Sequence, residues 1–169
     1  SHKGSWDSGT TWHGYQEARL MITIAQAMTD ALRNNGIYVY TDSYSKNNHN
    51  LTYTLKFIKK HSVSAFVNIH CDSPNAPAGT MPLYRTKTQK IFAKALNKGV
   101  HRYVSMKNRG LVRRTDLETL KNKEVPATCL FETGSIRYDN KILRNKAELI
   151  GIGLAHGLCD YFGREFVTE

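Results

Sequence analysis

Long apolar runs are missing from this sequence, and neither glycine nor proline is enriched. Without about 20 consecutive apolar residues, the chain offers no membrane-spanning helix. With 12 glycines, 4 prolines and 40% hydrophobic residues, the composition is that of a globular protein rather than a disordered one. A length of 169 residues suits one hydrophobic core, so we expect residues 1–169 to form a single domain and a monomer.

Cysteine is also scarce, and the three cysteines are an odd number: Cys71, Cys129 and Cys159. A disulfide framework needs more cysteines and an even count, so that class of small scaffold is excluded. The three lie in predicted strands or a predicted helix, which favours buried free thiols. Cys71 follows His70, but adjacent residues of an extended segment point to opposite faces, which disfavours a Cys–His nucleophile.

Acidic residues are few relative to basic ones, 14 against 24, and the formal net charge is +10. This excess predicts long-range attraction to polyanions, which include nucleic acid, anionic cell-wall polymers and acidic lipid. No zinc knuckle and no aromatic RNA-binding pattern is present, so we do not expect nucleic acid as the partner. A merely solvated basic surface is the simpler alternative.

Helix-like and strand-like segments alternate along the chain. Apolar residues at helical spacing predict helices over 14–34, 51–60, 86–103, 117–120 and 139–161, with Thr86 or Thr88 and Thr115 as caps. Short apolar runs predict strands over 37–41, 64–69, 81–84 and 126–131. This order predicts an α/β fold with three αβα layers, in which helices flank a twisted, mostly parallel sheet.

Two of the predicted strands end on an ionisable side chain. The strand 64–69 runs into His70, and the strand 126–131 runs into Glu132. Ligands of open parallel sheets bind at the carboxyl ends of the strands. A histidine and a glutamate at this edge are a possible metal ligand and a possible general base.

Two further groups join them if a strand precedes His2, and we expect such a first strand before residue 1. His2 would then end that strand, and Glu17 lies in the first turn of the helix that follows. Two imidazoles and one carboxylate are the ligand set of catalytic zinc sites, and a fourth carboxylate can serve as general base.

Each of these four residues has a simpler interpretation. His2 can be a remnant of cloning, and Glu17 a favourable charge at the positive end of a helix. His70 can be a satisfied histidine at a strand end, and Glu132 an acceptor in a turn. Their joint placement at one sheet edge favours the metal site over these separate explanations.

The motifs around these residues resemble those of the zinc-dependent N-acetylmuramoyl-L-alanine amidases of the Amidase_3 type. The resemblance covers essentially the whole chain, and its most specific parts are the histidine motif and the last strand. The segments that carry it are His2–Gly9, Gly14–Glu17, Asn68–Asp72, Asn108–Gly110 and Pro126–Gly134.

The resemblance implies a peptidoglycan hydrolase that cleaves the amide between the lactyl group of N-acetylmuramic acid and L-alanine. It implies one Zn²⁺ per chain, held by His2, Glu17 and His70, with Glu132 as the catalytic base. It also implies action outside the cell at the wall, as a secreted autolysin or a phage lysin. The alternatives are another zinc peptidase on the same scaffold and a non-catalytic wall-binding module.

Overall fold

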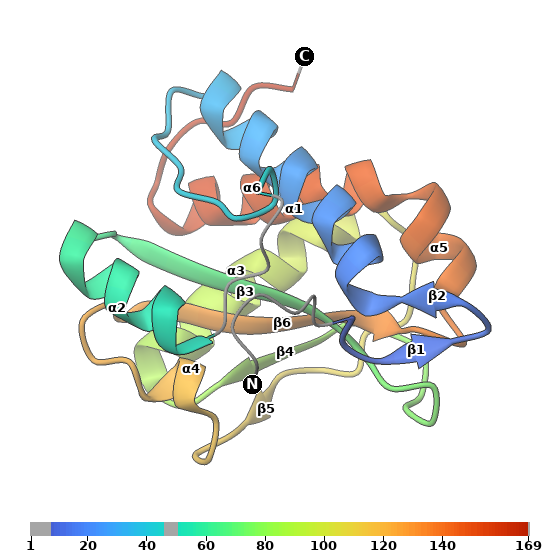
Figure 1. The fold of residues 1–169 in the computed structure, drawn as a ribbon. Coiled ribbons are helices and arrows are strands. Elements are labelled where there is room, and N and C mark those ends of the chain that lie inside the picture. Colours follow the sequence, from blue (N-terminus) through green and yellow to red (C-terminus); the bar gives the residue numbers. More distant parts are fainter. Residues whose placement is uncertain (1–7, 46–50, 169) are drawn as a thin grey trace.

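The computed structural model describes residues 8–45 and 51–168 (Figure 1). None of the helices in these ranges is long and apolar enough to cross a membrane. The elements, in chain order, are β1 (Thr11–Trp12), β2 (Tyr15–Gln16), α1 (Glu17–Asn34), α2 (Leu51–His61), β3 (Ala65–Asp72), β4 (Met81–Tyr84), α3 (Lys87–Tyr103), β5 (Val112–Arg113), α4 (Glu118–Lys121), β6 (Ala127–Ser135), α5 (Asn140–Asn145) and α6 (Ala147–Tyr161).

The main sheet has four strands in the order β3-β6-β4-β5. Strand β3 runs parallel to β6, and β4 runs parallel to β5, whereas β4 and β6 are antiparallel. The α/β prediction is confirmed, with the refinement that the sheet is mixed. Because β3 and β6 are parallel neighbours, His70 lies directly opposite Glu132 in the register.

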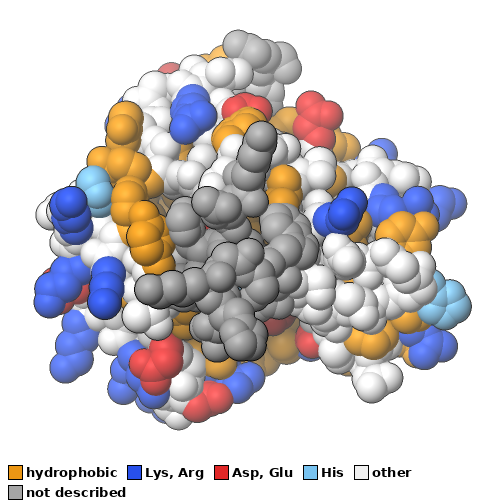
Figure 2. Space-filling model, in the orientation of Figure 1, with side chains coloured by type: hydrophobic (Ala, Val, Ile, Leu, Met, Phe, Trp, Pro, Cys, Tyr) orange, Lys and Arg blue, Asp and Glu red, His pale blue; other side chains and the backbone are white. Residues whose placement is uncertain are grey.

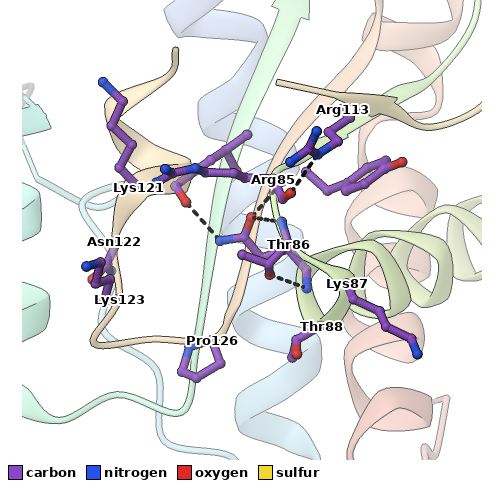
Figure 3. Close-up of a pocket in the computed structure, with 12 residues that line it drawn as sticks. Arg85, Thr86, Lys87, Thr88, Arg113, Lys121, Asn122, Lys123 and Pro126 are labelled. Atoms are coloured by element: carbon purple, nitrogen blue, oxygen red, sulfur yellow. Dashed lines mark hydrogen bonds between the residues drawn. The ribbon is translucent and has the colours of Figure 1, made fainter. Parts of the chain in front are cut away.

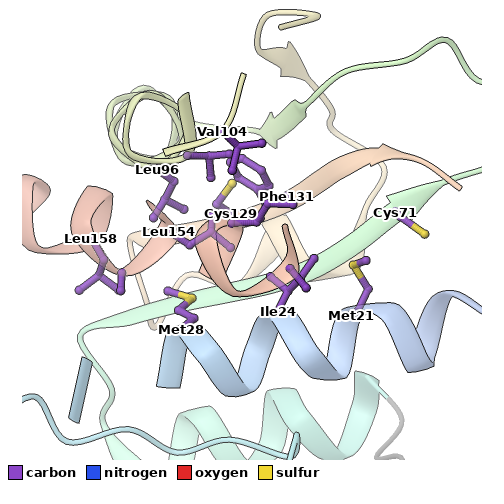
Figure 4. Close-up of a cluster of buried hydrophobic side chains, with 14 of the residues drawn as sticks. Met21, Ile24, Met28, Cys71, Leu96, Val104, Cys129, Phe131, Leu154 and Leu158 are labelled. Carbon is purple, nitrogen blue, oxygen red and sulfur yellow. The ribbon is translucent and has the colours of Figure 1, made fainter. Parts of the chain in front are cut away.

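Helices cover both faces of this sheet (Figure 1). The larger core lies on the face covered by α1, α3 and α6, and Figure 4 shows Cys129 and Phe131 of β6 inside it. A smaller cluster of Leu83, Leu120 and Leu130 joins the other face to α4. Side chains alternate along a strand, so Leu130 and Glu132 share the second face of β6.

Helix α6 lies very close to its neighbours because it carries glycine at the crossings. A Cβ added to Gly157 would lie 2.7 Å from the Cα of Leu96 in α3, and one added to Gly151 would lie 2.7 Å from the backbone nitrogen of Met28 in α1. Real Cβ atoms do not tolerate such contacts. These glycines therefore set how closely three helices pack over the sheet.

The first helix begins later than the sequence pattern indicates. We expected it from Gly14, but α1 starts at Glu17, after the hairpin of β1 and β2. His13 and Gly14 form the turn of this hairpin with φ of 47° and 82°. Positive φ at both central residues is the geometry of a two-residue type I′ turn, which fixes where the helix begins.

Other boundaries also differ from the predictions. Residues 37–41 form no strand, although Ile37 and Val39 pack on the core while Tyr38 is exposed, because none of the described residues pairs with this segment. The expected helix 139–161 is split into α5 and α6 at Lys146, where φ is −124°. Thr115 does not cap α4, but Thr86 caps α3 as predicted.

Candidate active site

Glu17 is held at the carboxyl edge of the sheet by the start of α1 and the loop before it. Its Oε2 accepts a hydrogen bond from the backbone N–H of Thr10 at 2.9 Å, and its own N–H donates to the Thr10 carbonyl at 2.9 Å. Gly9 lies directly against this carboxylate, and a Cβ there would overlap it. The glycine and the hydrogen bonds together fix the direction of the Glu17 side chain.

The other carboxylate oxygen of Glu17 faces His70. The Nδ1–H of His70 donates to Oε1 of Glu17 at 2.8 Å, and the N–H of Cys71 donates to the same oxygen at 3.3 Å. The His70 side chain is 38% exposed, whereas that of Glu17 is 13% exposed. The structure therefore brings these two predicted ligands together, with the imidazole accessible from solvent.

The charge state of His70 depends on this carboxylate. Burial alone lowers the pKa of His70, but the hydrogen bond and charge of Glu17, followed by the charge of Glu132, raise it overall. Glu17 thus stabilises the protonated form of the His70 imidazole, which donates a hydrogen bond to it. A cation held between the two groups would replace this proton.

Glu132 completes the cluster from the neighbouring strand. It lies between His70 of β3 and Met81 of β4 in the register. Its Oε2 is enclosed and has no hydrogen-bond partner among the described residues. Burial, more than the charges around it, raises the pKa of Glu132 to about 7. An enclosed carboxylate oxygen without a donor is unfavourable for stability and therefore indicates a missing ligand or a chemical role.

Hydrogen bonds behind the cluster hold the ends of β3 and β6. The Thr133 hydroxyl donates to the His70 carbonyl at 2.8 Å. The carboxylate of Asp139, which is 3% exposed, accepts from the N–H groups of Gly79 and Ser135, both at 2.8 Å. These contacts fix the strand ends that carry His70 and Glu132.

Asp72 and Arg109 were given no role by the sequence, yet they lie beside Glu132. The two terminal guanidinium nitrogens of Arg109, Nη2 and Nη1, donate to Oδ2 of Asp72 at 3.0 and 3.1 Å. The charges of both residues influence the pKa of Glu132, Asp72 raising it and Arg109 lowering it. The sequence signals for these two residues were their places in the motif segments Asn68–Asp72 and Asn108–Gly110, which did not indicate that they form an ion pair.

The thiol of Cys71 takes no part in this cluster. Cys71 is 3% exposed, and burial raises the pKa of its thiol far above the usual range. Cys129 and Cys159 are buried and free as well, which confirms the prediction of buried thiols. A low pKa is what makes a cysteine a nucleophile, so Cys71 does not fit that role.

The cluster has the chemistry of a zinc site, although it holds only part of the expected ligand set. His2 lies outside the described residues, and within residues 8–45 and 51–168 no group of three or more metal-type side chains is found. The two donors that are described, a carboxylate and an imidazole, converge at 2.8 Å beside the unpartnered oxygen of Glu132. Both donor types suit zinc, and a third ligand would complete a catalytic set.

Comparison with known protein families matches residues 1–160 to the N-acetylmuramoyl-L-alanine amidase family. This match spans nearly the whole chain and includes all four predicted site residues. No curated protein sequence matches the chain.

Several solved structures share the fold. The catalytic domain of the amidase CwlV from Bacillus (Paenibacillus) polymyxa var. colistinus has a TM-score of 0.86 and 20% identity, with 96% of this chain and 94% of that chain covered. For the amidase AmiC2 of Nostoc punctiforme the TM-score is 0.83, the identity 24% and the coverage 95% and 93%. A Clostridium difficile 630 amidase has a TM-score of 0.83, 22% identity and coverage of 95% and 92%.

Proposed function

The chain belongs to the N-acetylmuramoyl-L-alanine amidase family and is a peptidoglycan amidase, and we propose that it works through one zinc ion held by His2, Glu17 and His70. Zinc dependence is typical of this family. The single observation that carries the proposal is the convergence of Glu17 Oε1 and His70 Nδ1 at 2.8 Å beside the enclosed oxygen of Glu132.

The bond to be cleaved is the amide between the lactyl group of N-acetylmuramic acid and L-alanine. When bound, zinc supplies Lewis acidity that activates water and polarises the amide carbonyl. Glu132 takes the proton of the attacking water and passes it to the alanine nitrogen as the C–N bond breaks. The new C–O bond leaves a lactyl carboxylate and a free alanine amine.

The surroundings of Glu132 suit a group that accepts and then returns a proton. Its Oε2 carries no hydrogen bond among the described residues, so no neighbouring donor there competes for the proton-accepting carboxylate. The neighbouring strands fix its backbone on both sides. Arg109 forms an ion pair with Asp72, which orients the end of β3. Because Arg109 binds Asp72, it leaves the carboxylate of Glu132 free to accept a proton.

The wider biological setting is part of the proposal. An enzyme of this specificity acts on the wall from outside the cell, either as a secreted autolysin or as a phage lysin. A net charge of +10 favours binding to anionic wall polymers, and such binding weakens as salt screens the charges. We also propose that the protein acts as a monomer.

We further propose that residues 1–169 form one domain whose sheet takes up another strand, preceding residue 1, along β3. Within the described residues, β3 pairs with β6 alone, and seven of its eight residues are only partly buried. Amide exchange along the free edge of β3 should slow in a chain that begins earlier. Unchanged exchange would contradict this extra strand.

The zinc and reaction assignments are tested together on the purified chain. Elemental analysis should give one zinc per chain, and chelation should abolish amide cleavage that added Zn²⁺ restores. Product analysis on soluble muropeptides should show a new alanine amine and a free lactyl carboxylate. Cleavage within the stem peptide instead would identify a different peptidase, and full activity without metal would refute the zinc site.

A further inference from the structure

A pocket of about 650 Å³, whose lining residues are drawn in Figure 3, lies apart from the proposed active site along the sheet. Strand β4 runs antiparallel to β6, so Met81 lies beside Glu132 while Tyr84 lies toward the opposite end of the sheet. Tyr84 lines the pocket together with Pro126, which precedes β6. The Pro126 side of the pocket is therefore separated from Glu132 by the length of β6 from Ala127, roughly 17 Å at about 3.3 Å per residue.

The lining of this pocket is strongly basic. Among the described residues it contains five basic side chains and no acidic one; the five are Arg85, Lys87, Arg113, Lys121 and Lys123. Lys121 is paired with Glu118, but Lys87 and Lys123 have no carboxylate partner in the described part of the chain. Unpaired positive charges around a hollow attract an anion.

Gln89 lines the pocket, is 1% exposed, and joins its two walls through hydrogen bonds. Its Oε1 accepts from the N–H of Arg85 at 2.7 Å, and its Nε2 donates to the carbonyl of Leu120 at 3.0 Å (Figure 3). The Thr86 hydroxyl accepts from the N–H of Gln89 at 3.2 Å. This network joins the start of α3 to α4, so the two walls that carry the basic residues hold a fixed spacing.

Donors without acceptors also belong to residues that line the pocket. Lys87 and Thr88 begin the 17-residue helix α3, and backbone N–H groups in a first helical turn have no acceptor inside the helix. The side-chain Nδ2 of Asn122, which also lines the pocket, is enclosed without an acceptor among the described residues. Helix N-terminal amides, amide side chains and lysines are the groups that bind phosphate oxygens.

Basic side chains continue from the pocket onto α2. Lys59 lies 3.7 Å from Glu124, which is in the loop that leads from the pocket lining into β6. Lys56 and Lys60 are exposed on the same helix, and Figure 2 shows Lys and Arg side chains gathered on the α2 side of the molecule. A surface of this extent suits a polymer with repeated anionic groups better than a single small anion.

We propose that this basic pocket binds the phosphodiester groups of an anionic cell-wall polymer. The inference rests on the proposed function, because a peptidoglycan amidase meets such polymers beside its substrate. Binding at this end of the sheet holds the enzyme on the wall and leaves the end with His70 and Glu132 free for the glycan peptide.

The test compares two variants with the same change in charge. Lys87→Glu with Lys123→Glu alters the pocket, while Lys94→Glu with Lys98→Glu alters exposed lysines further along α3. At about 50 mM salt, affinity for purified poly(glycerol phosphate) should fall roughly tenfold or more in the pocket variant and much less in the control. Polyglutamate, a carboxylate polymer, should distinguish the two variants less clearly.

Each outcome decides the proposal. Equal loss in both variants would mean that only the net charge matters and would overturn it, as would a pocket variant that loses DNA binding but keeps the wall polymer. Cleavage of soluble muropeptides should be unchanged in both variants. A wild-type protein that binds the polymer but cleaves no muropeptide would refute the proposed function and leave the pocket assignment standing.

Discussion

The face of the sheet that carries Cys129 and Phe131 is packed under α1, α3 and α6, whereas the described residues cover the face that carries His70 and Glu132 only in part. Cys129 and Phe131 are fully buried, while the His70 side chain is 38% exposed. The three helices over the first face have 18, 17 and 15 residues, against 11 and 4 for α2 and α4.

The two faces therefore have different roles: one stabilises the strands by apolar packing, and the other carries the side chains of the site. Apolar packing on the first face stabilises the fold through buried area. The second face holds an enclosed carboxylate oxygen with no partner among the described residues, which costs stability. Substitutions on the first face should therefore change stability, and substitutions on the second should change activity.

Glu132→Gln should have the largest effect and should act on activity alone. The amide cannot accept the proton of the attacking water, so kcat should fall about a thousandfold. Zinc content should stay at the wild-type value, because Glu132 is not one of the proposed ligands. The unfolding midpoint should be unchanged or higher, since a charge enclosed without a partner is removed.

The matched control for this change is Glu148→Gln, which removes the same charge at an exposed position of α6. It should leave both kcat and stability near wild type. Near-normal turnover in Glu132→Gln would show that another group acts as the base. Loss of zinc together with turnover would place Glu132 among the ligands instead.

Gly157→Ala should have the next largest effect and should act on stability alone. Alanine at an exposed helical site stabilises a helix by up to about 1 kcal/mol relative to glycine. Here the new methyl group would overlap the backbone of Ala95 and Leu96 in α3, so we expect a net loss of about 2 kcal/mol in the free energy of unfolding. Denaturant unfolding measures this loss.

The control for Gly157→Ala is Lys98→Ala, at an exposed position of α3, which should change the free energy of unfolding by less than about 0.5 kcal/mol. At a temperature where the protein stays folded, Gly157→Ala should keep its kcat. A more stable Gly157→Ala protein would show that α3 and α6 can move apart, and would weaken the contrast between the two faces.

The same contrast explains how much of the molecule the sequence predicts. The apolar pattern was sufficient to place α2, α3 and β4, because α2 and α3 carry apolar residues at helical spacing and β4 is a short apolar run. It failed at residues 37–41, where the pattern of a strand is present but pairing within the described residues is not. The apolar pattern predicts which residues are buried, but a strand also needs a neighbouring strand with which to form backbone hydrogen bonds.

The site was predictable to a similar extent and for a related reason. Glu17, His70 and Glu132 could be placed at one sheet edge because the sequence put them at the start of a helix and at the ends of two strands, and the structure brings these three together. The predicted strand ends were too early, since β3 continues past His70 to Asp72 and β6 continues past Glu132 to Ser135. The ion pair of Asp72 and Arg109 could not be predicted, because Asp72 ends β3 while Arg109 lies between α3 and β5, and no sequence spacing relates the two. The position of His2, outside the described residues, stays a prediction.

Thr133→Val should have the smallest effect and should act on both properties, since Thr133 links the two faces. Its side chain is fully buried beside Met21 of α1, yet its hydroxyl donates to the carbonyl of His70. Valine keeps the shape and removes the donor, so we expect a loss of about 1 kcal/mol in the free energy of unfolding and roughly a tenfold fall in kcat as His70 shifts. Thr133→Ser keeps the hydroxyl and should restore most of the activity but not all of the stability. If valine lowered stability while kcat stayed at the wild-type value, the hydroxyl would serve packing alone, and the two faces would be more independent than this hydrogen bond implies.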